Sequence, residues 1–479
     1  MFFRAKKGVF GIASKHQGAK IRSETSLERH KPGIDTFNML LYNLITLLCV
    51  CLMNDVCKAL SVHPLKTLVV FDSRLTSLQD HSEFLQSLEN RDHELVFEQV
   101  DHEDFDPQFY FLSEDEHSNL YDNMIIFPIK TKRGSSSLTS SKLLKFYENG
   151  GDVLAITSPV GVTDPVRLFL NQLSIYPAPK GYILRDYFNA SDEKKNTFAI
   201  AGSDSLNDYV FNSSSDAELV YSKGSSALLG SSDLLVPILK APSTSLNKNV
   251  NDEEWTIGSQ GYLIAAFQNL KNARMTWVGS DKFFANGLYE SNNKAFIEEL
   301  TKWTFREKSV IKVNGAKHYH ADKTSYEELP YKTTDEVVYE ILLSEFKDNK
   351  WIPYEGTDVQ FELKMIDPYY RLTMNAEENV GESKKFTTGV FKLPDHHGVF
   401  TFQVDYKRPG LTYVESKSTH AIRNLAHTEY PRSWEITNAR VYLCSIFAVI
   451  GLWLVFVVAF IATSKKVVNK PTAASKKNN

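Results

Sequence analysis

Short apolar runs alternate with amphipathic segments from about residue 60 to residue 308. TLVVF at 67–71 and DVLAI at 152–156 are rich in β-branched residues and are followed by segments with one apolar helical face. Continuous apolar strands separated by helices are typical of a parallel sheet covered on both faces, so the pattern predicts an α/β domain over 60–308. The expected strands are 67–71, 95–100, 124–127 and 152–156, and the expected helices are 81–90, 141–148, 165–173 and 294–304. A hairpin or a pair of strands is expected at 263–267 and 275–278. Asn, Asp and Ser are dense at 180–240, which leaves open whether this region is one domain or two.

The pattern changes at residue 309. VQFELKMI at 359–366 alternates apolar and polar residues, which is the period of a half-buried strand, and Asp367-Pro368 follows as a turn. Short strands separated by turn residues predict an antiparallel β-sandwich over 309–425 and a juxtamembrane linker at 426–440. The expected strands are 337–343, 359–366, 386–393 and 399–405.

A long apolar run at 441–463 contains no Asp, Glu, Lys or Arg. As a helix it is about 35 Å long, enough to cross a bilayer. The lysine-rich tail at 464–479 is expected in the cytosol, because positive charge is retained on that side. Within the run, Ser445, Ala448 and Gly451 are candidate packing positions against partner helices.

A shorter apolar run, MLLYNLITLLCVCLM at 39–53, is too short for a comfortable span of a ~30 Å hydrocarbon core. It is typical of a signal peptide, with cleavage expected near Ala59, so residues 1–59 are interpreted as a targeting segment. The preceding basic stretch is long for such a segment, which favours a true start at Met39 or nearby. The alternative is an uncleaved signal anchor. Cleavage gives type I topology, with the N-terminal domains in the lumen.

Two kinds of short motif agree with this topology. Lys476 and Lys477 lie four and three positions from the C-terminus, as in the dilysine (KKxx) retrieval signal of type I endoplasmic-reticulum membrane proteins. Asn189 and Asn212 begin N-x-S triplets and are candidate glycosylation sites.

Net charge and cysteine content exclude several classes of function. The net charge of −4 provides no basic footprint for nucleic acid. The four cysteines are Cys49, Cys51, Cys57 and Cys444, so residues 58–443 contain none. Zinc-finger spacing, a redox CxxC motif and a thiol nucleophile are therefore excluded in the predicted lumenal domains.

Chemistry is sought first where the parallel strands end, because ligands bind at that edge of an α/β sheet. Asp72, Pro128 and Thr157-Ser158 follow expected strands. Ser158 lacks the GxSxG elbow that exposes a nucleophilic serine, which favours a turn or capping role. GxGxxG and Walker A loops are absent from the sequence.

Two histidine-rich segments are the remaining candidates. His318, His320 and Asp322 lie in HYHAD, where alternate residues on a strand share a face and two imidazoles can ligate a metal. Asp395, His396 and His397 lie in DHHG. The simpler interpretation is polar residues at sandwich edges. We therefore predict no catalytic, cofactor-binding or metal-binding residue.

Many ordered segments resemble one family, the 48-kDa subunit of the eukaryotic oligosaccharyltransferase in its fungal form, the wheat-germ-agglutinin-binding protein subunit. The resemblance covers about 65–479. Its segments include DNMIIFP (122–128), FYENGGDVL (146–154), RLFLNQLSIYPAPKGYILRDYF (167–188), SQGYLIAAFQNLKNARMTWVGS (259–280), WTFREKSVIK (303–312), HYHADKTSYEELPYK (318–332), MIDPYYRL (365–372), LPDHHGVFTFQVDY (393–406) and EYPRSWEI (429–436).

The resemblance implies an essential, non-catalytic subunit. The complex transfers a preassembled oligosaccharide from dolichol pyrophosphate to Asn in N-x-S/T sequons, and a multispanning subunit carries the catalysis and the divalent metal. The family's N-terminal domain is similar to glutamine-amidotransferase-like folds with a Rossmann-like sheet, whose cysteine nucleophile this chain lacks. The implied partners are the catalytic subunit, a ribophorin-II-like subunit and a small defender-against-death-like subunit.

Three hypotheses follow. The first is a structural and interaction subunit that scaffolds the complex. The second is a lumenal module that binds glycan or lipid-linked oligosaccharide, suggested by the strand-end cleft and by Tyr369 and Tyr370. The third is a hydrolase or transferase in its own right, using Ser158 or the histidines.

Overall fold

The computed structural model describes residues 65–100, 109, 119–130, 138–160, 162–212, 218–289, 293–347, 349–430 and 438–464. The predicted targeting segment at 1–59 and the retrieval signal at Lys476 and Lys477 lie outside the described residues. Our interpretation of these segments therefore stays a prediction.

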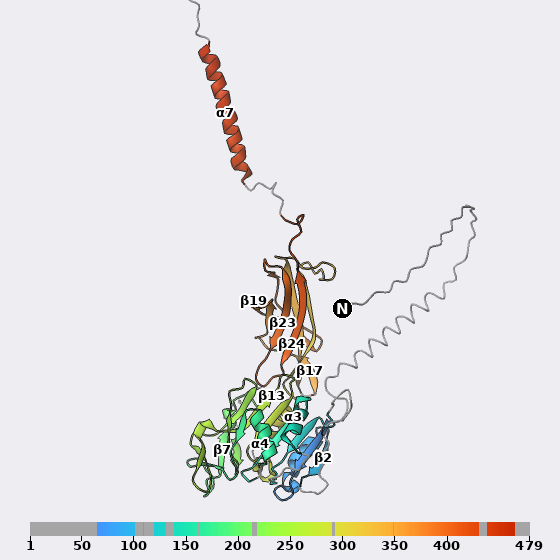
Figure 1. The fold of residues 1–479 in the computed structure, drawn as a ribbon, viewed down its shortest axis with the longest axis vertical. Helices are drawn as coiled ribbons and strands as arrows, with labels where there is room; N and C mark the ends of the chain where they lie inside the picture. Colours follow the sequence, from blue (N-terminus) through green and yellow to red (C-terminus); the bar gives the residue numbers. More distant parts are fainter. Residues whose placement is uncertain are drawn as a thin grey trace, which may run out of the picture. The chain divides into compact units, whose positions relative to one another are not determined.

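A nine-stranded mixed sheet forms the centre of the first domain (Figure 1), in the order β2-β1-β3-β4-β14-β13-β9-β5, with β10 also paired to β13. Its strands are β1 (Leu65–Phe71), β2 (His93–Gln99), β3 (Asn123–Ile126), β4 (Asp152–Ile156), β5 (Ile175–Pro177), β9 (Ala227–Leu229), β10 (Leu235–Lys240), β13 (Tyr262–Gln268) and β14 (Arg274–Val278). The first four strands and β14 are parallel, as the apolar runs predicted.

The sheet becomes antiparallel at β13, where the prediction of a parallel sheet was incomplete. A short turn joins β13 to β14, and the Asn269 carboxamide oxygen closes it by accepting hydrogen bonds from Lys271 N and Ala273 N, both 2.9 Å long. Such a tight connection reverses the chain, whereas a parallel neighbour needs a long crossover. The predicted hairpin at these two strands is confirmed.

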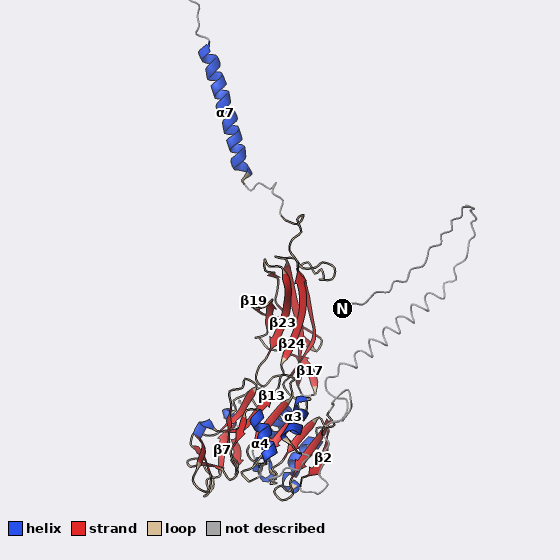
Figure 2. Ribbon diagram, viewed as in Figure 1, coloured by secondary structure: helices blue, strands red, loops and turns tan. Residues whose placement is uncertain are grey.

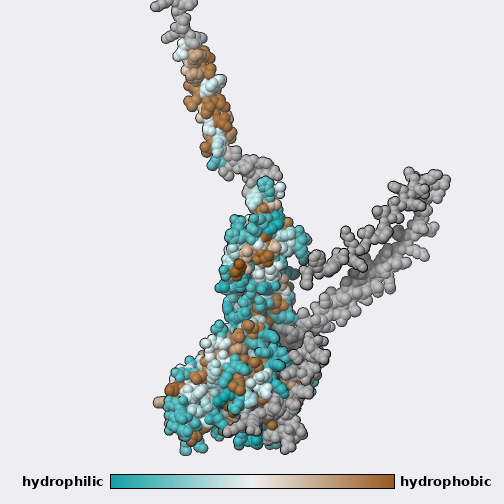
Figure 3. Space-filling model, viewed as in Figure 1, coloured by the Kyte–Doolittle hydropathy of each residue, from teal (hydrophilic) through white to brown (hydrophobic). Residues whose placement is uncertain are grey.

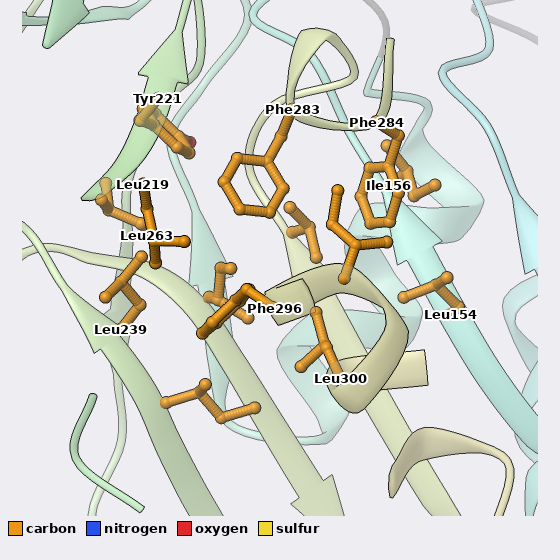
Figure 4. Packing of buried hydrophobic residues seen from close by; sticks show 14 of the residues in the cluster. Leu154, Ile156, Leu219, Tyr221, Leu239, Leu263, Phe283, Phe284, Phe296 and Leu300 are labelled. Carbon is orange, nitrogen blue, oxygen red and sulfur yellow. The ribbon is translucent and has the colours of Figure 1, made fainter. Parts of the chain in front are cut away.

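Helices cover both faces of the sheet because alternate strand residues point to opposite sides. Val69 and Ile125 pack with α2 (Ser82–Glu89) and α6 (Lys294–Thr304) in one buried cluster, part of which is shown in Figure 4. Leu68 and Met124 pack on the other side with α3 (Ser140–Glu148) and α4 (Asp164–Gln172). The further short helices include η1 (Leu78–His81) and α5 (Asn286–Leu288).

The segment rich in Asn, Asp and Ser, together with the residues that follow it as far as 257, contributes small sheets beside the main one. These are β6 (Ile183–Asp186), β11 (Ser245–Lys248) and β12 (Glu254–Ile257) in one sheet, and β7 (Thr197–Ala201) with β8 (Glu218–Ser222) in another. Leu219 and Tyr221 of β8 join Phe283 and Phe296 in the cluster of Figure 4. The core of this segment is therefore continuous with that under α6.

The second domain is a sandwich of two antiparallel sheets, built almost wholly from strands (Figure 2). One sheet has β15 (Val310–His320), β16 (Glu336–Lys347), β21 (Ser383–Thr387) and β20 (Asn375–Val380), with β17 (Lys350–Pro353) and β22 (Phe391–Lys392) paired to β16. The other has β19 (Pro368–Thr373), β18 (Gln360–Lys364), β23 (Gly398–Tyr406) and β24 (Val414–Ile422). The antiparallel prediction is confirmed.

Individual strands differ from the prediction in two ways. The strand expected at 386–393 is divided into β21 and β22, because Gly389 between them has a φ of 66°, outside the strand region. Strands β15, β17, β19, β20 and β24 were not among the predicted strands. The edge strands β19 and β20 were missed because their side chains are almost all exposed and carry no apolar alternation. The predicted domain limits at 308/309 and 425 stay predictions.

Arg274, the first residue of β14, joins the two domains. Its guanidinium is fully buried and donates to three carbonyls, Trp303 O at 2.7 Å, Lys308 O at 2.8 Å and Ser309 O at 2.7 Å. It also lies 4.6 Å from the centroid of the Trp303 ring. These carbonyls belong to the end of α6 and the segment leading to β15, so one cation fixes the connection between the domains.

The loop between β23 and β24 completes this joint. Trp303 Nε1 donates to Gly410 O and Gln268 Nε2 donates to Leu411 O, each at 2.7 Å. The Asn272 carboxamide donates to Tyr413 O at 2.9 Å and accepts from Tyr413 N at 2.6 Å, as a neighbouring strand would. The hairpin of the first domain is therefore hydrogen-bonded directly to the backbone of the second.

Helix α7 (Ala439–Ser464) follows the sandwich and is covered by hydrophobic side chains (Figure 3). Within the described residues it is the one helix long and apolar enough to cross a membrane. It coincides with the span predicted at 441–463.

Replacing Arg274 by methionine tests the joint. Arg274→Met keeps an apolar stem but leaves three carbonyls without their donor, so we expect the free energy of unfolding to fall by about 3 kcal/mol. Denaturant unfolding of the full chain in detergent, followed by tryptophan fluorescence, measures the change. Arg371→Met is the matched control, because Arg371 is exposed and pairs with Glu362; it should cost at most about 0.5 kcal/mol. Equal effects of the two variants would contradict the proposed role of the joint.

Candidate functional site

The strand-end edge of the main sheet places Asp72 directly after β1. Its carboxylate is buried and is held in a two-pronged ion pair, accepting from Arg74 Nε and Nη2 at 2.8 Å each. Lys130 N, just beyond β3, donates to the same group at 3.0 Å. Burial alone would raise the pKa of Asp72, but these donors outweigh it and lower the pKa. Asp72 is therefore an ionised structural link between the ends of β1 and β3.

Thr157 and Ser158 follow β4 at the same edge. The Thr157 hydroxyl accepts a hydrogen bond from Trp277 Nε1 at 3.0 Å and donates to Val278 O at 3.3 Å. Ser158 is buried, and among the described residues no hydrogen bond joins its hydroxyl to a histidine or a carboxylate. This geometry places no general base against Ser158.

The edge also holds His81 and Asp281, which the sequence analysis did not single out. His81 is buried at the end of η1, with its ring 5.1 Å from that of Phe127. Burial lowers the pKa of His81. A backbone hydrogen bond with Phe284 and the charge of Asp281 act to raise this pKa but do not outweigh burial. A buried neutral imidazole packed on an aromatic ring fits a core histidine. Its position before the first helix gave no sequence signal.

The two histidines of β15, His318 and His320, contact different partners. His318 Nδ1 lies 2.9 Å from the Tyr331 hydroxyl, and its ring is 4.0 Å from that of His420 on β24. His320 instead contacts Leu329 O at 2.8 Å through Nε2. The carboxylate of Asp322 accepts from Thr324 N at 3.0 Å. Across the described parts of the chain, no three His, Cys, Asp or Glu side chains are grouped as metal ligands.

Asp395, His396 and His397 lie in the exposed loop before β23. His396 packs edge-on against Tyr369 at 5.8 Å between ring centroids. This loop and the β15 histidines belong to the sandwich, whereas Ser158 belongs to the first domain. The sequence-predicted candidates therefore do not converge on one site.

The candidate glycosylation residues and the candidate packing residues of α7 lie among the residues that the structure describes. Asn189 is exposed in a turn fixed by buried Asp186, whose Oδ1 accepts from Phe188 N and Asn189 N. Asn212 is described, but the serine of its triplet is outside the described residues. In α7, the Ser445 hydroxyl donates to Tyr442 O at 2.7 Å, and Gly451 faces open space. These observations leave all of these roles as predictions.

Comparison with known proteins gives a consistent answer. The family model described as "OST48, N-terminal domain" matches residues 58–307, and the "OST48 middle domain" model matches residues 318–464. The Saccharomyces cerevisiae dolichyl-diphosphooligosaccharide–protein glycosyltransferase subunit WBP1 is 44% identical, over 86% of this chain and 94% of its own length. The Schizosaccharomyces pombe subunit wbp1 is 29% identical over 78% of this chain and 87% of its own. The Danio rerio 48 kDa subunit is 29% identical over 84% and 92%.

A solved structure, the mmIFT52 N-terminal domain, superposes with a TM-score of 0.37 and 13% identity. It covers 50% of this chain and 97% of its own. A likeness this loose supports no inference about function.

The paired imidazoles of His318 and His420 predict sensitivity to acid. Burial, together with the neighbouring His420, lowers the pKa of His318 from 6.5 to about 4. The proton therefore binds more tightly to the unfolded chain, so this stability is present above pH 6.5 and is lost as the pH falls towards 4. We expect the melting temperature of His318→Gln to fall less over this window than that of the wild type.

Differential scanning fluorimetry of the full chain in detergent provides the measurement. The control is His396→Gln, which changes an exposed histidine of the same sandwich and should melt with the wild-type pH dependence. An unchanged pH dependence in His318→Gln would show that other groups set the acid sensitivity.

Proposed function

This chain belongs to the OST48 family, and from that premise we propose that it is an essential, non-catalytic subunit that scaffolds an oligosaccharyltransferase complex. The complex would transfer a preassembled oligosaccharide from dolichol pyrophosphate to Asn in N-x-S/T sequons. The observation that carries the proposal is 44% identity to the yeast subunit over 94% of that subunit's length. Two OST48 matches together extend into α7, so the resemblance includes both domains and the apolar helix.

Hydrogen bonds between the two domains support a scaffolding role. The Arg274 joint and the paired hydrogen bonds of Asn272 hold the first domain to the sandwich. A partner bound to one domain is thereby positioned relative to a partner bound to the other. The strand-end edge is consistent with a non-catalytic role, because Asp72 pairs with Arg74 and no described residue places a base against Ser158.

We place the protein in the endoplasmic-reticulum membrane with type I topology. In this arrangement the domains at 60–308 and 309–425 are lumenal, α7 spans the bilayer, and Lys476 and Lys477 act as a cytosolic retrieval signal. The proposed partners are the multispanning catalytic subunit, a ribophorin-II-like subunit and a defender-against-death-like subunit. Ser445, Ala448 and Gly451 are proposed contacts with partner helices, because small residues let helices approach closely in a membrane.

A second candidate function is binding of the glycan or the lipid-linked oligosaccharide. The observation in its favour is a pair of exposed aromatic rings on β19, with Tyr369 42% and Tyr370 36% exposed. Aromatic faces of this kind are amphipathic, with an apolar ring and a polar hydroxyl.

Co-purification tests the scaffold. We expect an internally tagged chain, extracted in digitonin, to recover the multispanning catalytic subunit and its small partners; a C-terminal tag would mask Lys476 and Lys477. Replacing both Ala448 and Gly451 by leucine should release these partners, because added side-chain volume separates packed helices. Ile446→Phe, on the opposite side of α7, is the control and should retain them. A wild-type chain that purifies alone would overturn the proposed function.

A transferase assay of the assembled complex separates the three hypotheses. We expect a complex carrying both Ser158→Ala and His396→Ala to keep the wild-type kcat and KM, because neither side chain touches reacting groups in the scaffold role. Loss of kcat in an assembled complex would instead support catalysis by this chain. Tyr370→Ala should leave the KM for lipid-linked oligosaccharide unchanged in the scaffold role, whereas a roughly tenfold rise would favour the glycan-binding module.

A further inference from the structure

Ionic contacts hold the chain against the sandwich just before it continues to α7. After β24, the Glu429 carboxylate accepts from Arg423 Nη1 and Nη2 at 2.8 Å each and from Ala426 N at 2.8 Å. Lys332, from the loop between β15 and β16, lies 3.1 Å from the same group. These contacts lower the pKa of Glu429, led by the Arg423 hydrogen bonds. The chain is therefore fixed to this end of the sandwich as far as residue 429.

The length of the remaining connection is set by the sequence. Helix α7 begins at Ala439, ten positions after Glu429. Even fully extended, ten residues span at most about 35 Å. Because α7 is the proposed membrane span, this end of the sandwich stays within about 35 Å of the bilayer surface, a distance comparable with the sandwich itself.

An apolar group lies at this same end of the sandwich. It consists of Met365 and Ile366 in the turn between β18 and β19, Tyr369 on β19 and Val399 on β23, which we call the apolar tip. Their exposed fractions are 41%, 85%, 42% and 58% respectively. The side chain of Met365 lies over Gly398, where an added Cβ would be 2.9 Å from Met365 Cε. The ring of Tyr369 packs on Phe400 at 5.5 Å between centroids.

Strand register puts the apolar tip beside the exit to α7. Gly398 pairs with Ile422 and Val399 pairs with Ala421, at the end of β24. Lys364 pairs with Thr401, so the turn that follows β18 continues past Val399 in the same direction. Neighbouring strands are roughly 4.8 Å apart, which places Ile366 about 10 Å from the end of β24. The apolar tip and the connection to α7 therefore lie at the same end of the sandwich.

The neighbouring surface sets this group apart from ordinary scattered exposure. Single apolar residues are normal on protein surfaces, whereas adjacent ones mark contact sites. The exposed residues that flank the tip before β23 are polar, among them His396 and His397. Lys364, Asp367 and Asp395 surround the tip with mixed charge, so it carries no strong field of one sign. A tyrosine beside aliphatic side chains and mixed polar groups suits the boundary between lipid and water.

We propose that the apolar tip (Met365, Ile366, Tyr369 and Val399) inserts into the interfacial layer of the bilayer that α7 spans. The partner is the lumenal lipid surface, and the contact is a second, reversible attachment beside the covalent tether. Its consequence is a fixed height and tilt of the sandwich over the membrane. Through the Arg274 joint the same orientation passes to the first domain. This inference rests on the proposed membrane role of α7.

Fluorescence quenching by labelled lipids tests the contact. An environment-sensitive fluorescent amino acid is introduced at position 366 by nonsense suppression, and the assembled complex is reconstituted in nanodiscs. Ile366 is 85% exposed, so the replacement leaves the core unaltered. We expect a blue-shifted emission, and quenching by lipids with a nitroxide near the headgroup roughly twice that of a control site, as for residues buried in the headgroup region.

The control site is Val250, which is 90% exposed in the turn between β11 and β12 of the first domain. Equal quenching at 366 and 250 would overturn the proposal. A blue shift at 366 without quenching would also overturn it and would assign the tip to a partner protein. Recovery of the catalytic subunit before reconstitution establishes the assembly independently, so failure of the tip contact and failure of the proposed function are distinguishable.

Discussion

The buried guanidinium of Arg274 is the interaction on which the two-domain architecture depends. A cation taken out of water is costly unless its donors are satisfied, and here three backbone carbonyls and the face of Trp303 provide much of that compensation. Among the described residues, Arg274 Nε alone of this guanidinium has no hydrogen-bond partner. Those carbonyls all lie between the end of α6 and β15. The connection between the domains is therefore fixed because the arginine must be satisfied. Asn272 and Gln268 extend the same arrangement to the loop between β23 and β24.

Two further sets of ionic contacts hold the chain in place elsewhere in the molecule. Glu429 ties the chain to the far end of the sandwich just before the membrane helix. Asp72 accepts a hydrogen bond from Lys130 N and so links the ends of β1 and β3 in the first domain. The Asp72 carboxylate, at the strand-end edge of the main sheet, is held in an ion pair with Arg74. Both matched family domains lie in this part of the chain, which belongs to the OST48 family.

The sequence was informative wherever a pattern is local. Four parallel strands, the hairpin at β13 and β14 and the limits of α6 could all be predicted, because each depends on periodicity or on turn residues close in the chain. The edge strands β19 and β20 could not, since their exposed residues lack alternation. The partners of the histidines could not be predicted, because His318 and His320 share a strand yet have different partners, and His420 lies on another strand.

The sequence by itself determined the α/β and antiparallel classes, the apolar span and the family resemblance. It also determined the absence of cysteine from 58–443. Composition and periodicity are properties of the sequence alone and need no knowledge of the packed structure. Only the tertiary structure decided which side chains meet. Arg274 and Ser309 are separated by 35 positions, Asn272 and Tyr413 by 141, and each contact exists only because strand pairing brings distant segments together. The joint and the apolar tip both follow from such pairing, because exposure and hydrogen-bond satisfaction are properties of the packed molecule.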